Sequence, residues 1–348
     1  MFENLFVGIA EVLRSSLGGL PIEINEAIVM LVKIVGILLF VLTSTIGLVY
    51  MERKIAGFIQ ARIGPNRHGP KGLLQVPATV IKLMSKEVFI NKYADKVCFL
   101  AAAAFIFAPT LMAFAVVPFG KNMAAIDMNI GLFYLLALMS LGTILFWLSG
   151  WASNNKYSLI GGMRAVAQMV SYELPMVIII ASVVMLTGSL NLNEIVAAQE
   201  HSWFIFTQPI AFLIYFICGL AECNRTPFDL IEGESELVQG FSTEYSGMAF
   251  AMFYLAEYVN MVLICCVTAI LFLGGWHAPF GWEFLPSWFW FFIKIFIVMF
   301  VMMQIRWTYP RLRVDQLMGF GWKVLLPLSL ANVFITGAGM YIYRAIGW

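Results

Sequence analysis

The sequence predicts an all-α fold, a polytopic bundle of about eight transmembrane helices. Three observations predict it: 61% of the residues are hydrophobic, only 12% are charged, and the apolar residues gather in eight long runs. A soluble globular protein carries about 25% charged residues, so a soluble fold is excluded. We expect one integral membrane domain over residues 1–348, because a helix that crosses lipid needs about 20 apolar residues and satisfies its own backbone.

The predicted elements begin with a helix at the membrane interface. Residues 1–20 lack the basic region of a signal peptide and end in Gly18-Gly19-Leu20-Pro21, which favours an interfacial helix. The eight apolar runs follow at 28–50, 97–119, 130–150, 165–187, 204–220, 247–274, 287–307 and 322–343. At about 1.5 Å per residue, the first run can cross a hydrocarbon layer of about 30 Å.

Basic residues indicate how these spans are oriented. The first, third, fifth and seventh connections carry 16 of the 21 Lys and Arg residues, whereas the opposite side, with both termini, carries only Arg14, Lys121 and Arg344. The positive-inside rule therefore places the odd connections in the cytoplasm and both termini outside.

Two cytoplasmic connections, 51–96 and 221–246, are unusually long. After the turn cluster 64–70 of the first, apolar residues recur at helical spacing. Gln75, Thr79, Lys82 and Lys86 form one polar stripe beside them. We expect an amphipathic helix that lies on the membrane surface or covers a cavity.

The second long connection is acidic although it lies on the positive side. Its carboxylates are Glu222, Asp229, Glu232, Glu234, Glu236 and Glu244, against Arg225 alone. Acidic groups contribute little to orientation, so the predicted topology tolerates them.

Two carboxylates fall inside predicted spans, Glu173 in the fourth and Glu257 in the sixth. A charge at a helix centre costs about 2.5–3.5 kcal/mol, which protonation or hydration relieves. Pro175 should kink its helix and free the carbonyl of Ser171, as a proton path requires. The alternative to a proton path is that each Glu forms a purely structural pair with a residue of a neighbouring helix. Lys33 and Lys294 lie near the outer ends of their spans. We expect Lys33 to snorkel to the interface, whereas for Lys294, which lies deeper, both snorkelling and a functional role stay open.

The segment 309–317 forms a third polar cluster, with Arg311, Arg313 and Asp315. It is either an ordinary basic stop after a span or a charged rim in which arginines, Arg225 included, neutralise the acidic loop. The five cysteines and three histidines show no zinc or iron–sulfur spacing, so we expect no metal and no redox centre in this chain.

Three groups of motifs resemble one family. The first connection contains Met51-Glu52-Arg53-Lys54, Arg62-Ile63-Gly64-Pro65-Asn66-Arg67 and Gly72-Leu73-Leu74-Gln75. The acidic loop contains Asn224-Arg225-Thr226-Pro227-Phe228-Asp229, Glu232-Gly233-Glu234-Ser235-Glu236-Leu237 and Glu244-Tyr245-Ser246-Gly247, and the last cluster is Pro310-Arg311-Leu312-Arg313-Val314-Asp315-Gln316-Leu317-Met318. In this order, over 49–343, they resemble the H-type membrane subunit of bacterial respiratory complex I (NADH-quinone oxidoreductase), whose mitochondrial equivalent is numbered 1.

The resemblance implies a membrane subunit of a proton-pumping NADH:quinone oxidoreductase that builds much of its quinone tunnel. It implies quinone-tunnel positions at Arg53, Arg62, Gln75, Asp229, Glu232 and Arg311. It implies a proton path through Glu173, Glu222, Glu234, Glu236, Glu244 and Glu257, and rim ion pairs of Arg225, Arg313 and Asp315.

The same resemblance implies the cofactors and partners. Quinone is the substrate, and no cofactor is bound by this chain, since FMN and iron–sulfur clusters belong to partner subunits. The implied partners are the peripheral quinone-module subunits, small membrane subunits of the pumping arm, and lipid, but no nucleic acid. We expect the protein in the bacterial inner membrane rather than in an organellar one, because the long N-terminal extension favours a bacterial protein.

The chain departs from the family pattern at Thr79, where an acidic residue is usual, and at Cys223, which replaces Thr. Thr79 puts in doubt whether the amphipathic helix joins a charge relay. Three alternatives stay open: the related subunit of a membrane-bound hydrogenase, an independent ion transporter and a passive scaffold. A transporter should show inverted repeats, and none is evident.

Overall fold

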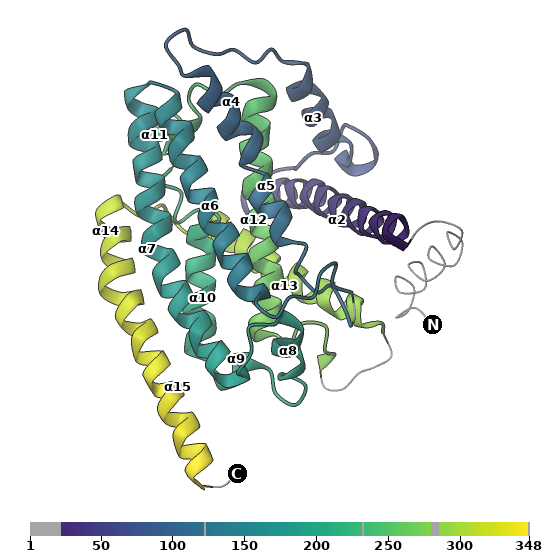
Figure 1. Ribbon diagram of the computed structural model, residues 1–348. Helices are drawn as coiled ribbons and strands as arrows, with labels where there is room; N and C mark the ends of the chain where they lie inside the picture. Colours follow the sequence, from purple (N-terminus) through teal and green to yellow (C-terminus); the bar gives the residue numbers. More distant parts are fainter. Residues whose placement is uncertain (1–21, 122, 232, 280–284, 347–348) are drawn as a thin grey trace.

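The computed structural model describes residues 22–121, 123–231, 233–279 and 285–346, and every regular element within these ranges is helical. The predicted polytopic helical bundle is thereby confirmed (Figure 1). The interfacial helix predicted over 1–20 lies outside the described residues.

Seven helical stretches in the described part of the chain are long and apolar enough to cross a membrane. They are α2 (Ile22–Ile59), the pair α4 (Lys96–Phe105) and α5 (Ala108–Ala113), α6 (Gly131–Ala152), α7 (Lys156–Thr187), α12 (Gly247–Phe272), α13 (Ser287–Thr308), and the stretch α14 (Val314–Phe320), η4 (Gly321–Leu325) and α15 (Leu326–Ile346). The fifth predicted run forms the shorter apolar helix α10 (Pro209–Glu222). The remaining elements are η1 (Pro70–Gly72), α3 (Gln75–Ser85), α8 (Leu192–Ala197), α9 (Phe204–Thr207), α11 (Glu234–Leu237) and η2 (Gly240–Ser242).

Several helices differ from the predicted runs. Helix α7 begins at Lys156 rather than at residue 165, and the fifth run is divided into α9 and α10. Helix α2 continues to Ile59, beyond the predicted end at residue 50, because Glu52 is buried and paired rather than exposed in a loop. The second run is divided into α4 and α5. Pro109 has no N–H to donate to the carbonyl of Phe105, the last residue of α4, so the helix is interrupted there. Pro175, in contrast, lies within a continuous α7.

Four connections meet on one face of the bundle, which we call the loop face; they are residues 60–95, 153–155, 223–246 and 309–313. Hydrogen bonds join them from Asn154 to the Tyr93 carbonyl, from Asn155 to Glu244, from the Phe89 amide to Ser246 and from the Leu312 amide to the Pro227 carbonyl. These are the odd connections of the sequence, so consecutive spans run in opposite directions. On the opposite face, Asn191 donates to Asp127 and the Lys121 amide donates to Ser287.

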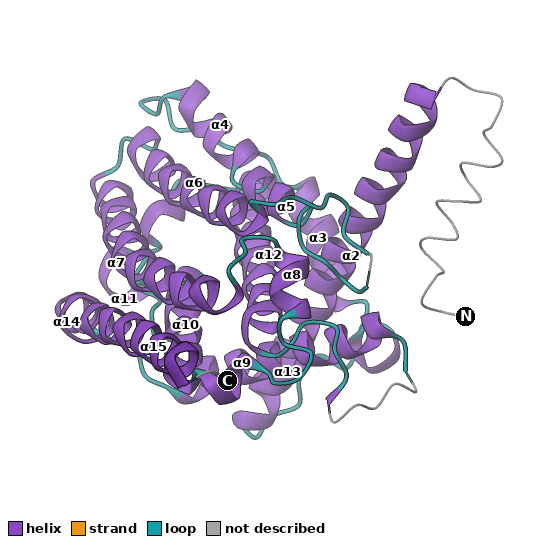
Figure 2. Ribbon diagram, turned by 60° about the horizontal axis from the view of Figure 1, so that its bottom comes forward, coloured by secondary structure: helices purple, strands orange, loops and turns teal. Residues whose placement is uncertain are grey.

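Helix α12 lies inside the bundle, among α2, α4, α5, α10 and α13 (Figure 2). Apart from a few polar residues such as Glu257 and Asn260, apolar residues occur on every side of it, as expected of a helix that contacts protein all round. Helix α2 is steeply inclined to the other long helices and projects from them at its N-terminal half (Figures 1 and 2). There it exposes Met30, Leu31 and Leu39. The amphipathic helix α3 packs against both α2 and α12.

Close packing at Gly161 joins α7 to the acidic loop. A Cβ atom at Gly161 would lie 2.7 Å from the Gly240 Cα and the Phe241 N, both of them backbone atoms. We expect Gly161→Ala to destabilise the protein by about 1–3 kcal/mol, because neither backbone can move away cheaply. Thermal unfolding of the purified protein in detergent measures this effect. Gly339→Ala in α15 is the matched control, since its Cβ would meet nothing within 4 Å; equal stability of the two variants would contradict the prediction.

Candidate functional site

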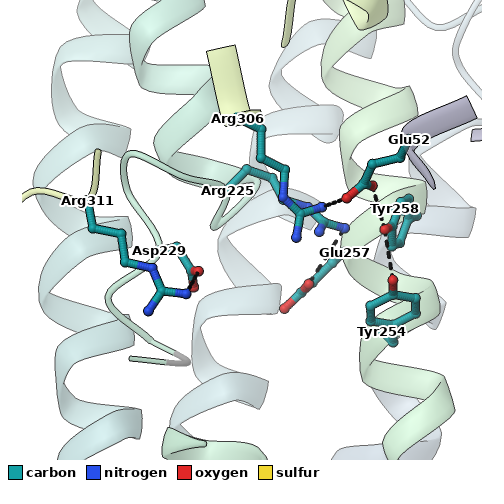
Figure 3. A network of polar contacts seen from close by, with 8 residues as sticks. All are labelled: Glu52, Arg225, Asp229, Tyr254, Glu257, Tyr258, Arg306 and Arg311. Atoms are coloured by element: carbon teal, nitrogen blue, oxygen red, sulfur yellow. Dashed lines mark hydrogen bonds and ion pairs between the residues drawn. The ribbon is translucent and has the colours of Figure 1, made fainter. Parts of the chain in front are cut away.

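An ion pair joins α2 to α13 near the loop face. Arg306 donates through Nη1 to Oε1 of Glu52, whose side chain is 8% exposed (Figure 3). The other oxygen of Glu52, Oε2, accepts a hydrogen bond of 2.6 Å from the Tyr258 hydroxyl on α12. Both carboxylate oxygens are therefore occupied, as a buried carboxylate requires.

A second ion pair lies directly beyond Tyr258. The guanidinium carbon of Arg225, from the acidic loop, is 4.1 Å from the centroid of the Tyr258 ring. The Arg225 Nη2 is 3.8 Å from Oε2 of Glu257 on α12, and the two side chains are only 5% and 6% exposed. Burial alone would lower the pKa of Arg225, but Tyr258, Glu257 and Glu52 outweigh burial and raise its pKa. Arg225 therefore stays charged inside the protein.

A small cavity adjoins Glu257. It has a volume of about 30 Å³, and its polar lining consists of Thr110, Glu222, Asn224, Glu257 and Asn260. At about 10–15 Å³ per water, the cavity has room for about two waters with several polar partners. The Oε2 atom of Glu222 is buried and has no hydrogen-bond partner in the described part of the chain, which suits a water at this position.

Amide side chains hold the backbone that carries Glu222 and Arg225. Gln168 on α7 donates to the Ala221 carbonyl at 2.8 Å and to Oδ1 of Asn224 at 3.2 Å. Asn260 on α12 donates to the Glu222 carbonyl at 3.2 Å. The start of the acidic loop is thus fixed between two long helices.

The predicted acidic residues take several different environments. Asp229 pairs with Arg311 at 2.9 Å, Glu236 pairs with Arg164 of α7, and Glu244 accepts a hydrogen bond from Asn155. Glu173 is half-buried on α7 and within electrostatic range of Glu222. Glu232 lies outside the described residues, and the side chain of Glu234 is not among the described ones.

The predicted rim arginines have different partners. Arg311 neutralises an acid of the loop, Asp229, whereas Arg225 pairs with the intramembrane Glu257. Arg313 pairs with Asp315, its own neighbour at the start of α14, and both side chains are exposed.

The predicted quinone-tunnel residues lie in two regions. Arg53 is half-buried near the end of α2, Arg62 is exposed just after that helix ends, and Gln75 is half-buried at the start of α3, which packs against α2. Asp229 and Arg311 lie on the side of Arg225 that is opposite Glu52 (Figure 3). Thr79 donates to the Gln75 carbonyl, one turn back in α3, so its hydroxyl is used within the helix.

Sequence reasoning missed Glu52, Arg306, Tyr258 and Asn260 as site residues. Glu52 stood within a recognised motif, and Arg306 was counted only as a topology signal. Neither signal shows that the two side chains meet, since 254 positions separate them.

The two lysines of the outer span ends differ. Lys33 is exposed and donates to the Ala125 carbonyl. Lys294 is buried and points inward, donating to the carbonyls of Gly275 at 2.9 Å and His277 at 2.6 Å, with its ammonium 4.3 Å from the Trp203 ring centroid. It holds the α12–α13 connection instead of snorkelling.

Comparison with known proteins identifies the family. The family model described as NADH dehydrogenase matches residues 32–337. A protein of Carboxydothermus hydrogenoformans, named as the H-type subunit of NADH-quinone oxidoreductase, is 52% identical over 351 residues, which cover 100% of both chains. The chain belongs to the H-type subunit family of NADH-quinone oxidoreductase.

Other members of the family are similarly close. An H-type subunit of Geobacter metallireducens, numbered 2, is 49% identical over 92% of this chain and 97% of its own length. The H-type subunit of a Geobacillus strain is 54% identical over 82% of this chain and 86% of its own length. The resemblance predicted from the motifs is confirmed. In the described residues, no group of three or more His, Cys, Asp and Glu side chains could hold a metal ion.

Proposed function

We propose that this chain is the membrane subunit of a proton-pumping NADH:quinone oxidoreductase, in which it forms much of the quinone tunnel and couples quinone reduction to proton translocation. One observation carries the coupling: polar contacts run from Glu52–Arg306 near the loop face, through Tyr258 and Arg225, to Glu257 and the cavity beside Glu222. The relatives' names supply the enzyme and its quinone substrate.

The proposal includes the orientation and the partners. The loop face is cytoplasmic and both termini lie outside in a bacterial inner membrane, as the positive-inside rule favours. The peripheral quinone-module subunits cover the loop face. The bundle by itself exposes many large apolar side chains, such as Phe58, Phe133 and Phe334. Membrane subunits of the pumping arm and lipid cover them.

Quinone enters this tunnel from the bilayer beside α2 and α3. Its apolar tail needs no aqueous route, and α3 exposes Ile81 and Met84 to it. The head group passes Arg53, Arg62 and Gln75 toward the peripheral arm. Asp229 and Arg311 act on the far side of this route, and the resemblance assigns Glu232 to the same tunnel. The electrons come from FMN and iron–sulfur clusters of partner subunits, and this chain contributes no redox centre.

Reduction of the quinone consumes two protons and leaves the site transiently electronegative. Nearby carboxylates respond by binding protons and changing partners. The response passes from Glu222 and Glu257, which share the cavity, to Glu173 and onward to the pumping subunits. Glu234, Glu236 and Glu244 adjust the charge of the loop. Interacting acids titrate as a set, so no single one is the switch.

The test uses the complex that contains this chain, purified and reconstituted in vesicles. We expect NADH oxidation to require quinone and to acidify one compartment. A photoreactive quinone with a long apolar tail should label α2, α3 or the loop face. Activity driven by hydrogen without quinone would instead identify the hydrogenase alternative. Labelling confined to lipid-facing surfaces far from α2 and α3 would contradict the tunnel.

A further inference from the structure

We propose that Tyr258 is a positioning residue that links the Glu52–Arg306 ion pair to the Arg225–Glu257 ion pair, using its hydroxyl for the first and its ring face for the second. This inference rests on the proposed function and deepens it. It assigns the coupling between quinone chemistry and the intramembrane acids to one aromatic side chain.

The hydroxyl contact has a defined direction. Tyr258 donates its single phenolic proton to Oε2 of Glu52 at 2.6 Å. The Tyr254 hydroxyl, 2.9 Å away, must then act as the donor to the Tyr258 oxygen. The order Tyr254 to Tyr258 to Glu52 places Tyr258 as the charge-assisted donor to the carboxylate, the stronger of the two bonds.

The ring contact supports Arg225 where few other groups do. The guanidinium lies over the Tyr258 ring at 4.1 Å, within the range of a cation–π contact. The Nε and Nη2 atoms of Arg225 are buried and have no hydrogen-bond partner in the described part of the chain, since Glu257 is 3.8 Å from Nη2. The face of Tyr258 is therefore a main support of Arg225, and through it of Glu257.

The phenol ring is rigid, so its two contacts cannot change independently. A movement of the Glu52 carboxylate, which Arg306 holds in place, lengthens the hydrogen bond that orients the ring. A tilt of the ring removes its face from Arg225, and the distance from Arg225 to Glu257 changes with it. Glu257 lines the cavity with Glu222, so the change reaches the intramembrane acids.

Two substitutions separate the two contacts. Tyr258→Phe removes the hydroxyl and keeps the ring, whereas Tyr258→Leu removes both. Tyr134→Phe on α6 is the matched control, because it removes a tyrosine hydroxyl outside this network. Each variant is purified in the complete complex, and protons translocated per electron are measured beside KM and kcat for quinone.

We expect Tyr258→Phe to lower the protons per electron by about threefold or more while kcat stays within about twofold, because only the link is cut. Tyr258→Leu should lower the protons translocated per electron by about tenfold, because Arg225 also loses its contact with the ring. The Tyr258→Phe effect should vanish in a Glu52→Gln background, as a double-mutant cycle requires of two directly coupled groups.

The outcomes are distinguishable. Equal coupling in Tyr258→Phe and wild type, or equal loss in Tyr258→Phe and Tyr258→Leu, overturns the inference while the proposed function stands. A wild-type complex that does not couple quinone reduction to protons overturns the proposed function itself. If Tyr258→Phe fails to assemble, Glu52→Gln decides, because it removes the charged acceptor: normal coupling in that variant overturns the inference.

Discussion

Glu257→Gln is expected to lower quinone-driven proton translocation by about tenfold or more, because it leaves Arg225 buried without its carboxylate. The two side chains are 5% and 6% exposed, so bulk water screens the loss little. Breaking a buried pair costs about 3–5 kcal/mol, and we expect lower thermal stability of the complex as well. Acidification by reconstituted vesicles and thermal unfolding measure the two effects.

The control for Glu257→Gln is Glu194→Gln, which makes the same chemical change at an exposed position on the opposite face. It should resemble wild type in both measurements. A full proton gradient in Glu257→Gln would contradict the proposed proton path through the intramembrane acids. It would favour the passive scaffold, which needs no carboxylate at that depth.

Arg306→Gln is expected to reduce quinone-dependent NADH oxidation by about tenfold, because Glu52 is then a buried carboxylate without its cation. Arg306→Lys should recover only part of the activity, since lysine keeps the charge but lacks the planar donor fork. Steady-state rates at varied quinone concentration measure the effect.

The lower NADH oxidation of Arg306→Gln must come from impaired reaction with quinone and not from failed assembly of the complex. Electron transfer from NADH to a water-soluble acceptor, which needs no membrane subunit, should be unchanged in the same preparation. Lys96→Gln, an exposed cation at the start of α4, serves as the matched surface control. Loss of both activities together would point to failed assembly and contradict the assigned role.

The sequence by itself determined the helical bundle, its apolar runs, the amphipathic helix after the first long turn cluster, and the family. These properties depend on local composition and periodicity: about 20 apolar residues make a span wherever they lie, and a polar stripe at helical spacing makes an amphipathic helix. The sequence also indicated that Glu173 and Glu257 need an explanation, because a carboxylate at bilayer depth is costly in any fold.

Only the tertiary structure decided the partners of those charges. One interpretation of the segment 309–317 was a charged rim that neutralises the acidic loop. Arg311 does pair with Asp229 of that loop, whereas Arg225 pairs with Glu257 and Arg313 with Asp315. Glu52 meets Arg306 across 254 positions, and the ring between the two ion pairs comes from a third helix. No local pattern encodes such contacts, because they depend on how the helices pack and on which charged groups must be paired once water is excluded.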